Sequence, residues 1–197
     1  MRPQRAGVVV VLALAGLALL AAPAAAFDAE AGRQKAEPCA ACHGPHGNSE
    51  TPGVPSLAGQ PARYIILALY QFRAGRRRSE AMSPFAAPLA DEDLGDLAAY
   101  FSAQAPAPPR HTADATKAEA ARQLAQQAHC VQCHGPALTG QEHIPRIAGQ
   151  DYDYVLAQLH GFKAATRPDI DGLMTSAAQP LADADIAVLA DYLAGLR

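Results

Sequence analysis

The sequence predicts an all-α fold built from two tandem copies of one small helical domain. Three observations carry this prediction: an internal repeat, apolar residues at helical spacing in both halves, and no run with convincing strand alternation. Hydrophobic residues make up 50% of the 197 positions and the formal net charge is −3. This composition is typical of a globular chain and far from that of disordered proteins.

The internal repeat covers most of the chain at a nearly constant offset of 90 to 92 residues. The segment 39–45 (CAACHGP) returns as 130–136 (CVQCHGP), and 55–60 (PSLAGQ) returns as 145–150 (PRIAGQ). Further pairs follow in the same order: Tyr64 and Tyr154, Phe72 and Phe162, Met82 and Met174. Such conserved order within one chain indicates duplication of a domain.

A proline-rich stretch at 104–113 separates the two copies. It cannot continue a helix and favours an extended, semi-rigid linker. The predicted domains are therefore 27–103 and 114–197. Domains of this size have little core of their own and often depend on a cross-link or a cofactor.

Helices are expected at equivalent places in the two halves. The expected segments are 28–37, 63–74 and 91–103 in the first half, and 114–129, 152–163 and 183–196 in the second. Acidic residues in the first turn of the last helix of each half complement the helix dipole. The Gly- and Pro-rich stretches between them are expected to be loops, at 44–61, 83–88, 135–149 and 166–180.

Residues 1–26 are interpreted as a signal peptide that is cleaved after Ala26. Arg2 and Arg5 precede an apolar run at 8–22, which small residues follow. An uncleaved membrane anchor is the alternative, but the apolar run is short for crossing a bilayer. We therefore expect a mature protein in the periplasm, with peripheral association with the membrane left open.

Without this leader, 14 basic and 19 acidic side chains remain, a net charge of −5. The balance argues against nucleic acid as a partner, because phosphate binding needs a basic surface. One basic cluster stands out, at Arg73, Arg76, Arg77 and Arg78. A solvated surface loop is the simpler interpretation, and a docking patch for an acidic partner is the alternative.

All four cysteines lie in two C-x-x-C-H units, the attachment signature of haem c. The units comprise Cys39, Cys42 and His43, and Cys130, Cys133 and His134. One helical turn puts both sulfurs of a unit on the same side, where they reach the two vinyl groups of one porphyrin, and the histidine then approaches the iron. A thioredoxin-like dithiol, a zinc site and disulfides are the alternatives. Two equivalent units behind a signal peptide favour two haem c groups.

Each haem iron has a second axial position to fill. Apart from Met1, the only methionines are Met82 and Met174, one in each repeat at matching positions. A methionine is ordinarily core filler, but this equivalence predicts axial ligation by both. His/Met ligation raises the reduction potential and leaves no vacancy for oxygen or peroxide, which favours electron transfer over catalysis. The remaining histidines are weaker candidates: His46, His111, His129, His143 and His160.

Over its mature length the chain resembles the dihaem cytochrome c4 family, in which two class I cytochrome c domains follow one another. The resemblance rests on C-x-x-C-H-G, the P-x-x-x-G-Q loop, the distal methionine and a final helix with an aromatic residue. It implies that each cytochrome c-like domain wraps around a covalently bound haem. It further implies that the carbonyls of Pro55 and Pro145 accept a hydrogen bond from the proximal histidines, and that the domains pack across a pseudo-twofold axis.

The resemblance also implies a function. The expected protein is not an enzyme but a periplasmic carrier that passes single electrons from respiratory-chain donors to a terminal oxidase or another acceptor. The main alternative is the haem c subunit of a periplasmic oxidoreductase such as a flavocytochrome sulfide dehydrogenase. A dihaem peroxidase is disfavoured by the chain length and by a methionine in each half. The longer loop before Met174 predicts that the two haem environments differ.

Overall fold

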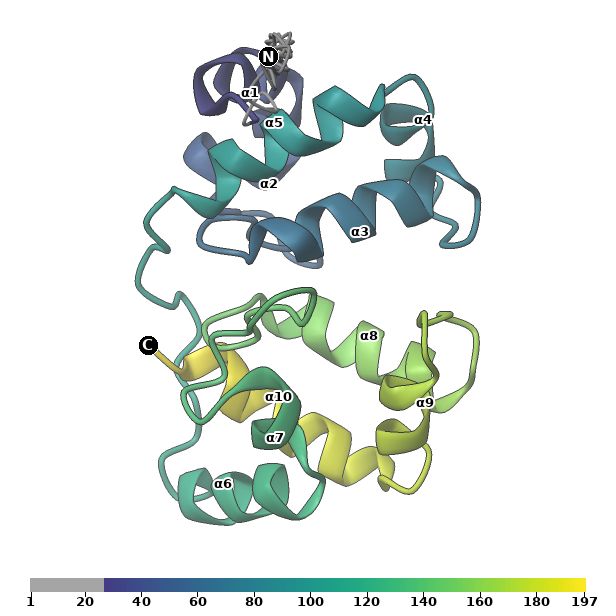
Figure 1. Cartoon of the computed structure of the whole chain (residues 1–197). Coiled ribbons are helices and arrows are strands. Elements are labelled where there is room, and N and C mark those ends of the chain that lie inside the picture. The colour runs from purple at the N-terminus through teal and green to yellow at the C-terminus, as the bar shows by residue number, and fades with distance from the viewer. Residues whose placement is uncertain (1–26) are drawn as a thin grey trace, which may run out of the picture.

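The computed structural model describes residues 27–197, which form two helical lobes stacked on one another (Figure 1). Within this range the only strand-like pairing is an isolated bridge between Gln141 and Ile144. The all-α fold expected from the sequence is therefore confirmed. None of the helices in this range is long and apolar enough to cross a membrane. The predicted signal peptide lies outside the described residues.

The first lobe packs two helices against its last one. Its helices are α1 (Ala29–Lys35), α2 (Ala40–His43), α3 (Ala62–Arg73), α4 (Met82–Ala86) and α5 (Asp91–Ser102), with 3-10 turns at Glu37–Cys39 and Pro45–Gly47. Both α1 and α3 lie against α5. A Cβ atom on Gly32 of α1 would lie only 2.0 Å from the carbonyl oxygen of Asp96 in α5. This close crossing therefore requires a glycine.

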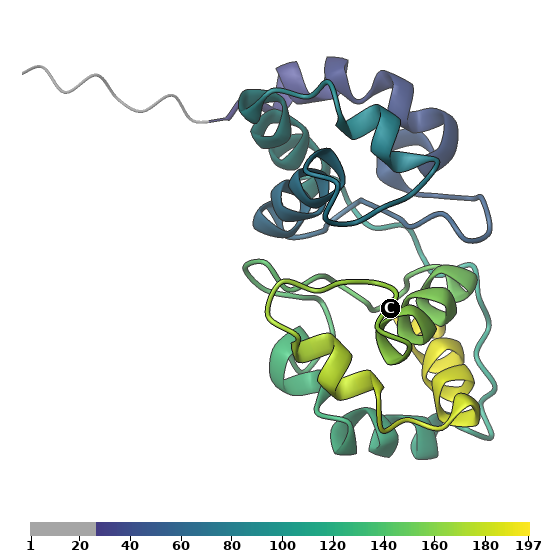
Figure 2. The same cartoon turned by 90° about the vertical axis from the view of Figure 1, so that its right-hand side faces the viewer.

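The second lobe repeats this plan, as Figure 2 shows from the side. Its helices are α6 (Ala118–Gln127), α7 (Cys130–His134), α8 (Tyr152–Lys163), α9 (Leu173–Ala178) and α10 (Asp183–Gly195). α10 packs against α6 and α8, as α5 packs against α1 and α3. Its apolar face, with Ile186, Leu189 and Leu193, is buried in the core. The two lobes therefore place equivalent helices in the same order.

Two short helices occupy stretches where loops were expected. α4 begins at Met82, and α9 begins one residue before Met174. Upstream side chains satisfy the first N–H groups of both helices: Met82 donates to the hydroxyl of Ser79 (3.1 Å), and Met174 donates to the carboxylate of Asp169 (2.7 Å). The loop prediction was wrong here because these contacts stabilise helices too short to show a periodic pattern.

The segment that connects the lobes is tied at both ends. Asn48 donates to the carbonyl of Ala105 (3.1 Å) and accepts from the N–H of Ala107 (2.7 Å). Further along, Nε2 of His111 lies 2.7 Å from a carboxylate oxygen of Asp191. The segment therefore follows the surface of both lobes, while the domain limits given above stay a prediction.

A reciprocal pair of glutamines joins the lobes. Gln60 donates to the carbonyl of Arg146 (2.9 Å) and accepts from its N–H (3.0 Å). Gln150 donates to the carbonyl of Ser56 (2.9 Å) and accepts from its N–H (2.7 Å). The two glutamines are 90 residues apart, and so are their two partners. Each lobe therefore offers the same surface to the other, as subunits do in a twofold-symmetric dimer.

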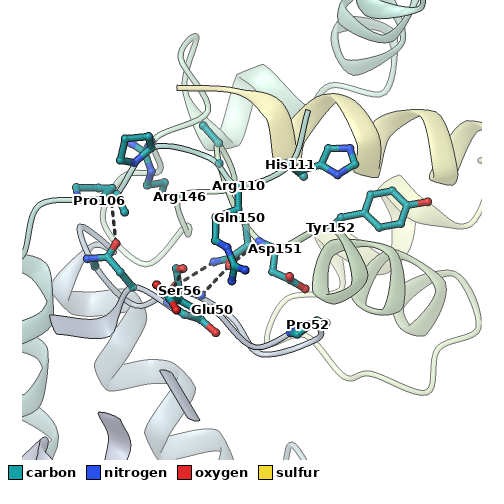
Figure 3. A pocket seen from close by; sticks show the side chains of 18 of the residues that line it. Glu50, Pro52, Ser56, Pro106, Arg110, His111, Arg146, Gln150, Asp151 and Tyr152 are labelled. Atoms are coloured by element: carbon teal, nitrogen blue, oxygen red, sulfur yellow. Dashed lines mark hydrogen bonds between the residues drawn. The ribbon is translucent and has the colours of Figure 1, made fainter. Parts of the chain in front are cut away.

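Beside these glutamines lies a cavity of about 320 Å³ between the linker and both lobes (Figure 3). Its walls include Glu50, Arg110 and Arg146, and the N–H of Gly53 donates to Asp151 nearby (2.8 Å). None of the cysteines and neither of the two described methionines lines it. The cavity is therefore a feature of the interface and separate from the C-x-x-C-H units.

Candidate functional site

Each C-x-x-C-H unit is wound into one tight helical turn. In the first lobe Cys39 ends a 3-10 turn and α2 carries Cys42 and His43, whereas α7 carries the whole second unit. The first cysteine of each unit, Cys39 or Cys130, packs against the hydrophobic core of its lobe. The second cysteine of each unit, Cys42 or Cys133, is exposed. None of these four cysteines is paired in a disulfide. The side chains needed for covalent attachment are thus presented at the edge of each core.

A glycine ends both turns directly after the histidine. Gly44 has φ 75° and Gly135 has φ 83°, a backbone region that other residues rarely adopt. The chain therefore leaves the turn sharply at this point. The histidine stays directed into the lobe while the following loop runs away from it.

The two histidines are buried in equivalent surroundings. His43 is 5% and His134 is 4% exposed. Nδ1 of His43 lies 2.8 Å from the carbonyl oxygen of Pro55, and Nδ1 of His134 lies 2.8 Å from that of Pro145. A carbonyl oxygen can only accept, so Nδ1 carries the proton and Nε2 keeps its lone pair. Burial lowers the pKa of both histidines, which keeps the imidazoles neutral.

This donor set suits a haem better than a bare metal ion. Among residues 27–197 no group of three or more His, Cys, Asp and Glu side chains converges as a metal-ion site. Each unit instead offers two thiols one turn apart and one neutral imidazole with a free nitrogen. These are the groups that attach and ligate a haem c.

The methionines are carried by helices separate from the cysteine-bearing turns. Met82 and Met174 are both half-buried. Their helices pack against α3 and α8 respectively, so each methionine is fixed to a long helix of its own lobe. The structure therefore gives both side chains equivalent positions.

The surroundings of the two methionines differ in charge. A neutral hydroxyl, from Ser79, binds the N–H of Met82, whereas the Asp169 carboxylate binds the N–H of Met174 and both the N–H and hydroxyl of Thr175. Burial favours the neutral form of Asp169, but the bonds from Thr175 and Met174 outweigh it and hold its pKa below the usual value. The second lobe therefore has a carboxylate bonded to the backbone of its methionine, where the first lobe has a neutral hydroxyl.

The weaker histidine candidates lie away from the two units or at the surface. His46 is exposed, with Nδ1 3.2 Å from the Tyr100 hydroxyl, and His129 is also exposed. His111 stacks on Tyr152 with ring centroids 5.1 Å apart. None of these contacts resembles the histidine–proline pairs.

Sequence reasoning missed the buried part of the basic cluster. Arg76 and Arg78 are exposed, as a surface loop requires, but Arg77 is half-buried and reaches across to Tyr154. The repeat held the signal: Arg167 lies 90 residues after Arg77. An arginine that recurs at the equivalent position of both copies therefore predicts a buried side chain better than a run of arginines in one copy does.

Comparisons with known proteins cover both lobes. Residues 28–101 match the family model of cytochrome c oxidase, cbb3-type, subunit III, and 118–197 match that of cytochrome c. The chain is 40% identical over 181 residues to cytochrome c4 of Thiocapsa roseopersicina, covering 86% of this chain and 93% of that protein.

Solved structures agree with the sequence comparison. Reduced recombinant cytochrome c4 from Pseudomonas stutzeri matches at 34% identity with a TM-score of 0.81, covering 87% of this chain and 100% of that one. A thiosulfate dehydrogenase from Marichromatium purpuratum matches at 34% identity with a TM-score of 0.77, covering 86% of this chain but 40% of that one. Because the similarity to the cytochromes c4 runs through both lobes and both cysteine–histidine units, the chain belongs to the cytochrome c4 family and is an electron-transfer protein with two haem c groups.

Proposed function

We propose that this protein carries single electrons in the periplasm, from a respiratory-chain donor to a terminal oxidase or another acceptor. The observation that carries the proposal is the pair of equivalent histidine–proline contacts, 2.8 Å in each lobe. They give both lobes the same neutral imidazole with a free Nε2. Two such centres in one chain suit a protein that takes up an electron from one partner and releases it to another.

The proposed attachment and ligand residues follow the repeat. They are Cys39 and Cys42 with His43 and Met82 in the first lobe, and Cys130 and Cys133 with His134 and Met174 in the second. A haem iron held between imidazole and thioether exchanges one electron and has no open position for oxygen or peroxide. The carbonyls of Pro55 and Pro145 would fix the orientation of each imidazole, and its burial would keep it unprotonated.

An exported location is part of the proposal. The predicted signal peptide supports it, and peripheral association with the membrane surface remains compatible with it. Mass spectrometry of the periplasmic fraction tests this location. We expect a chain that begins at Phe27 and carries the mass of two haems, whereas a retained leader would contradict cleavage after Ala26.

The ligands and the carrier role can be tested on one preparation from a host competent in cytochrome c maturation. We expect two haems per chain, a reduced c-type α band, a thioether–iron charge-transfer band at the red end, and oxidation of the reduced protein by respiratory membranes. Met82→Ala and Met174→Ala should each remove the red band from one haem and lower its potential. If both variants kept the full band, the axial ligands would be wrong. Membranes that fail to oxidise the intact protein would count against the carrier role.

A second candidate is the electron-accepting subunit of a periplasmic oxidoreductase, comparable with the haem c subunit of a flavocytochrome sulfide dehydrogenase. The similarity to the thiosulfate dehydrogenase supports it, because the match covers only 40% of that chain. Purification distinguishes the two roles. A carrier purifies alone, whereas a subunit purifies with a catalytic partner whose substrate reduces its haems.

A further inference from the structure

Exposed aromatic rings and exposed arginines occur together at the end of the first lobe where α3 leads into α4. Tyr70 is 36% exposed, and the guanidinium groups of Arg73 and Arg76 lie over its ring, 5.8 and 5.6 Å from the centroid. Arg78 is exposed in the loop that follows, and Phe85 is 55% exposed on α4, which packs against α3. We name Tyr70, Arg76, Arg78 and Phe85 the first-lobe basic face.

The charges of Arg76 and Arg78 are available to a partner. Arg73 is already engaged, because its guanidinium donates to the carboxylate of Asp91 (2.5 Å). Among the described residues no carboxylate forms an ion pair with Arg76 or Arg78. Arg77, which lies between them, reaches into the second lobe, and its two neighbours stay exposed to solvent. The face therefore presents two uncompensated positive charges beside an aromatic ring.

The second lobe shows that the fold does not require these two arginines. Thr166 and Pro168 occupy the equivalent positions, 90 residues later. The stretch 73–80 contains four arginines and one glutamate, whereas its counterpart 163–171 contains two basic and two acidic residues. Apolar side chains are exposed near the methionine of both lobes, since Ile170 is 56% exposed. The two lobes therefore share exposed apolar side chains in this region and differ in the charge around them.

The loop that carries the arginines is held in place by the first lobe. The N–H of Arg77 donates to the carbonyl of Gln71 (3.0 Å), and the N–H of Ser79 donates to the hydroxyl of Ser83 (3.1 Å). Because the loop is fixed before a partner arrives, docking costs little conformational entropy. The loop ends directly at Met82, so a partner bound here lies next to the helix that carries the proposed ligand of the first haem.

We propose that the first-lobe basic face is the docking site for an acidic redox protein, and that the second lobe takes no part in this docking. The inference rests on the carrier function proposed above and adds the site and the charge of one partner. Aromatic residues and arginine are enriched in the centres of protein interfaces. Complementary charge steers the encounter and selects the partner. Because the chain without its leader has a net charge of −5, only a local basic surface can attract an acidic protein.

A compact protein suits this face better than an anionic lipid bilayer does. Figure 1 shows α4 and α9, with the loops that precede them, on the same side of the molecule. A bilayer is extended and would also meet Asp169 and Asp171 in the loop before α9. A compact partner contacts the first lobe alone, and charges more than about 10 Å away are screened by salt.

Stopped-flow oxidation of the reduced dihaem protein by plastocyanin, an acidic blue copper protein, tests the charge of the partner. One electron passes from haem Fe(II) to Cu(II), which leaves Fe(III) and Cu(I). The test variant combines Arg76→Gln with Arg78→Gln. The matched control combines Arg33→Gln with Arg122→Gln, which removes two exposed charges from α1 and α6. At low ionic strength we expect the test variant to react about tenfold more slowly and the control to stay within about twofold of wild type. A test variant no slower than the control would overturn the docking site.

Nuclear magnetic resonance locates the contact in the same complex. Cadmium-substituted plastocyanin is redox-inert, so it can be titrated into the isotope-labelled dihaem protein without electron transfer. We expect amide shifts at 74–86 and none at the equivalent 164–178. Shifts centred on the second lobe, or shifts that persist in the test variant, would refute the assignment to the first lobe.

Sedimentation with phosphatidylglycerol vesicles tests the lipid alternative. We expect the test variant and its control to sediment alike. Vesicle binding that is lost in the test variant alone would overturn the proposal in favour of a membrane-binding face.

Two further measurements separate docking from damage to the haem or the fold. Arg76→Lys combined with Arg78→Lys keeps both charges and should restore the wild-type rate with plastocyanin, whereas an equally slow reaction would contradict steering by charge. Oxidation by tris(phenanthroline)cobalt(III), a cation, should not slow in the test variant, and an equal loss there would also overturn the proposal. None of these measurements uses respiratory membranes, so failure of the docking site leaves the carrier role intact, and failure of that role appears as lack of oxidation by membranes.

Discussion

Removal of one interlobe glutamine should weaken the association of the lobes by an amount that the hydrogen bonds predict. Gln150→Ala removes the partner of both backbone groups of Ser56, which it contacts at 2.9 and 2.7 Å. The glutamine is 7% exposed, so the contacts are largely shielded from water. The truncated side chain cannot replace either contact.

The expected loss can be worked out from these two contacts. A hydrogen bond contributes about 1 kcal/mol net, and a buried group left without a partner costs about 1–3 kcal/mol. Ser56 is half-buried, so water can reach part of the gap. We therefore expect Gln150→Ala to lower the free energy of unfolding by about 2–4 kcal/mol. Gln60→Ala should cost a similar amount, because it loses the equivalent contacts with Arg146 and is 3% exposed.

Urea unfolding of the dihaem protein, with small-angle X-ray scattering to detect separated lobes, measures this effect. Gln34→Ala on the exposed side of α1 is the control and should change stability by less than about 0.5 kcal/mol. The double variant of the two interface glutamines should scatter as an extended particle. Single variants with unchanged unfolding midpoints, together with a compact double variant, would refute the reasoning.

Three other perturbations test the packing, the haem asymmetry and the acid response. Gly32→Ala should destabilise the first lobe by about 1–3 kcal/mol in urea unfolding, because its Cβ would lie 2.0 Å from the carbonyl oxygen of Asp96. Asp169→Asn should raise the potential of the second haem in a redox titration, because it removes a negative charge 2.7 Å from the backbone nitrogen of Met174. The hydrogen bond from Lys35 is the largest effect that lowers the pKa of Asp96. The contact between Lys35 and Asp96 therefore stabilises the folded state at pH values above the usual carboxyl pKa. This contribution is lost as the pH falls through the lowered pKa that Asp96 has in the folded state. Asp96→Asn should flatten the acid side of a plot of stability against pH.

Matched variants serve as controls for these three changes. Gln34→Ala on the same helix should leave the unfolding midpoint unchanged where Gly32→Ala lowers it. Ser79→Ala alters the equivalent contact of the first lobe without a change in charge, so the second potential should stay at its wild-type value. Glu37→Gln removes an exposed carboxylate and should keep the acid slope. A test variant that behaved like its control would contradict the corresponding argument.

Local sequence patterns were enough to locate the long helices. The apolar spacing predicted helices at 63–74 and 152–163, and the structure has α3 at Ala62–Arg73 and α8 at Tyr152–Lys163. A helix of three turns contains enough residues for the apolar spacing to be recognised in the sequence. α4 and α9 have five and six residues, too few for such a pattern, and side chains outside them satisfy their first N–H groups. The axial roles of the methionines that they carry stay a prediction.

Contacts between the lobes could not be predicted from local patterns. The bond between Arg77 and Tyr154 joins residues 77 positions apart, and that between Gln150 and Ser56 joins residues 94 apart. Nothing near Arg77 in the sequence distinguishes it from the exposed Arg76 beside it. Only the recurrence of the same residue type in both copies marked the positions that meet in space.

The reciprocal glutamine contacts give each lobe the capacity for self-recognition. A lobe expressed by itself would retain its own interface glutamine and also the backbone groups that the glutamine of the other lobe contacts. Two copies of one lobe could therefore pair as a symmetric homodimer. In the intact chain the linker at 104–113 keeps the two interface surfaces at an effective concentration in the millimolar range. Pairing within one molecule therefore outcompetes exchange of lobes between molecules, and lengthening the tether would shift that competition toward domain-swapped dimers.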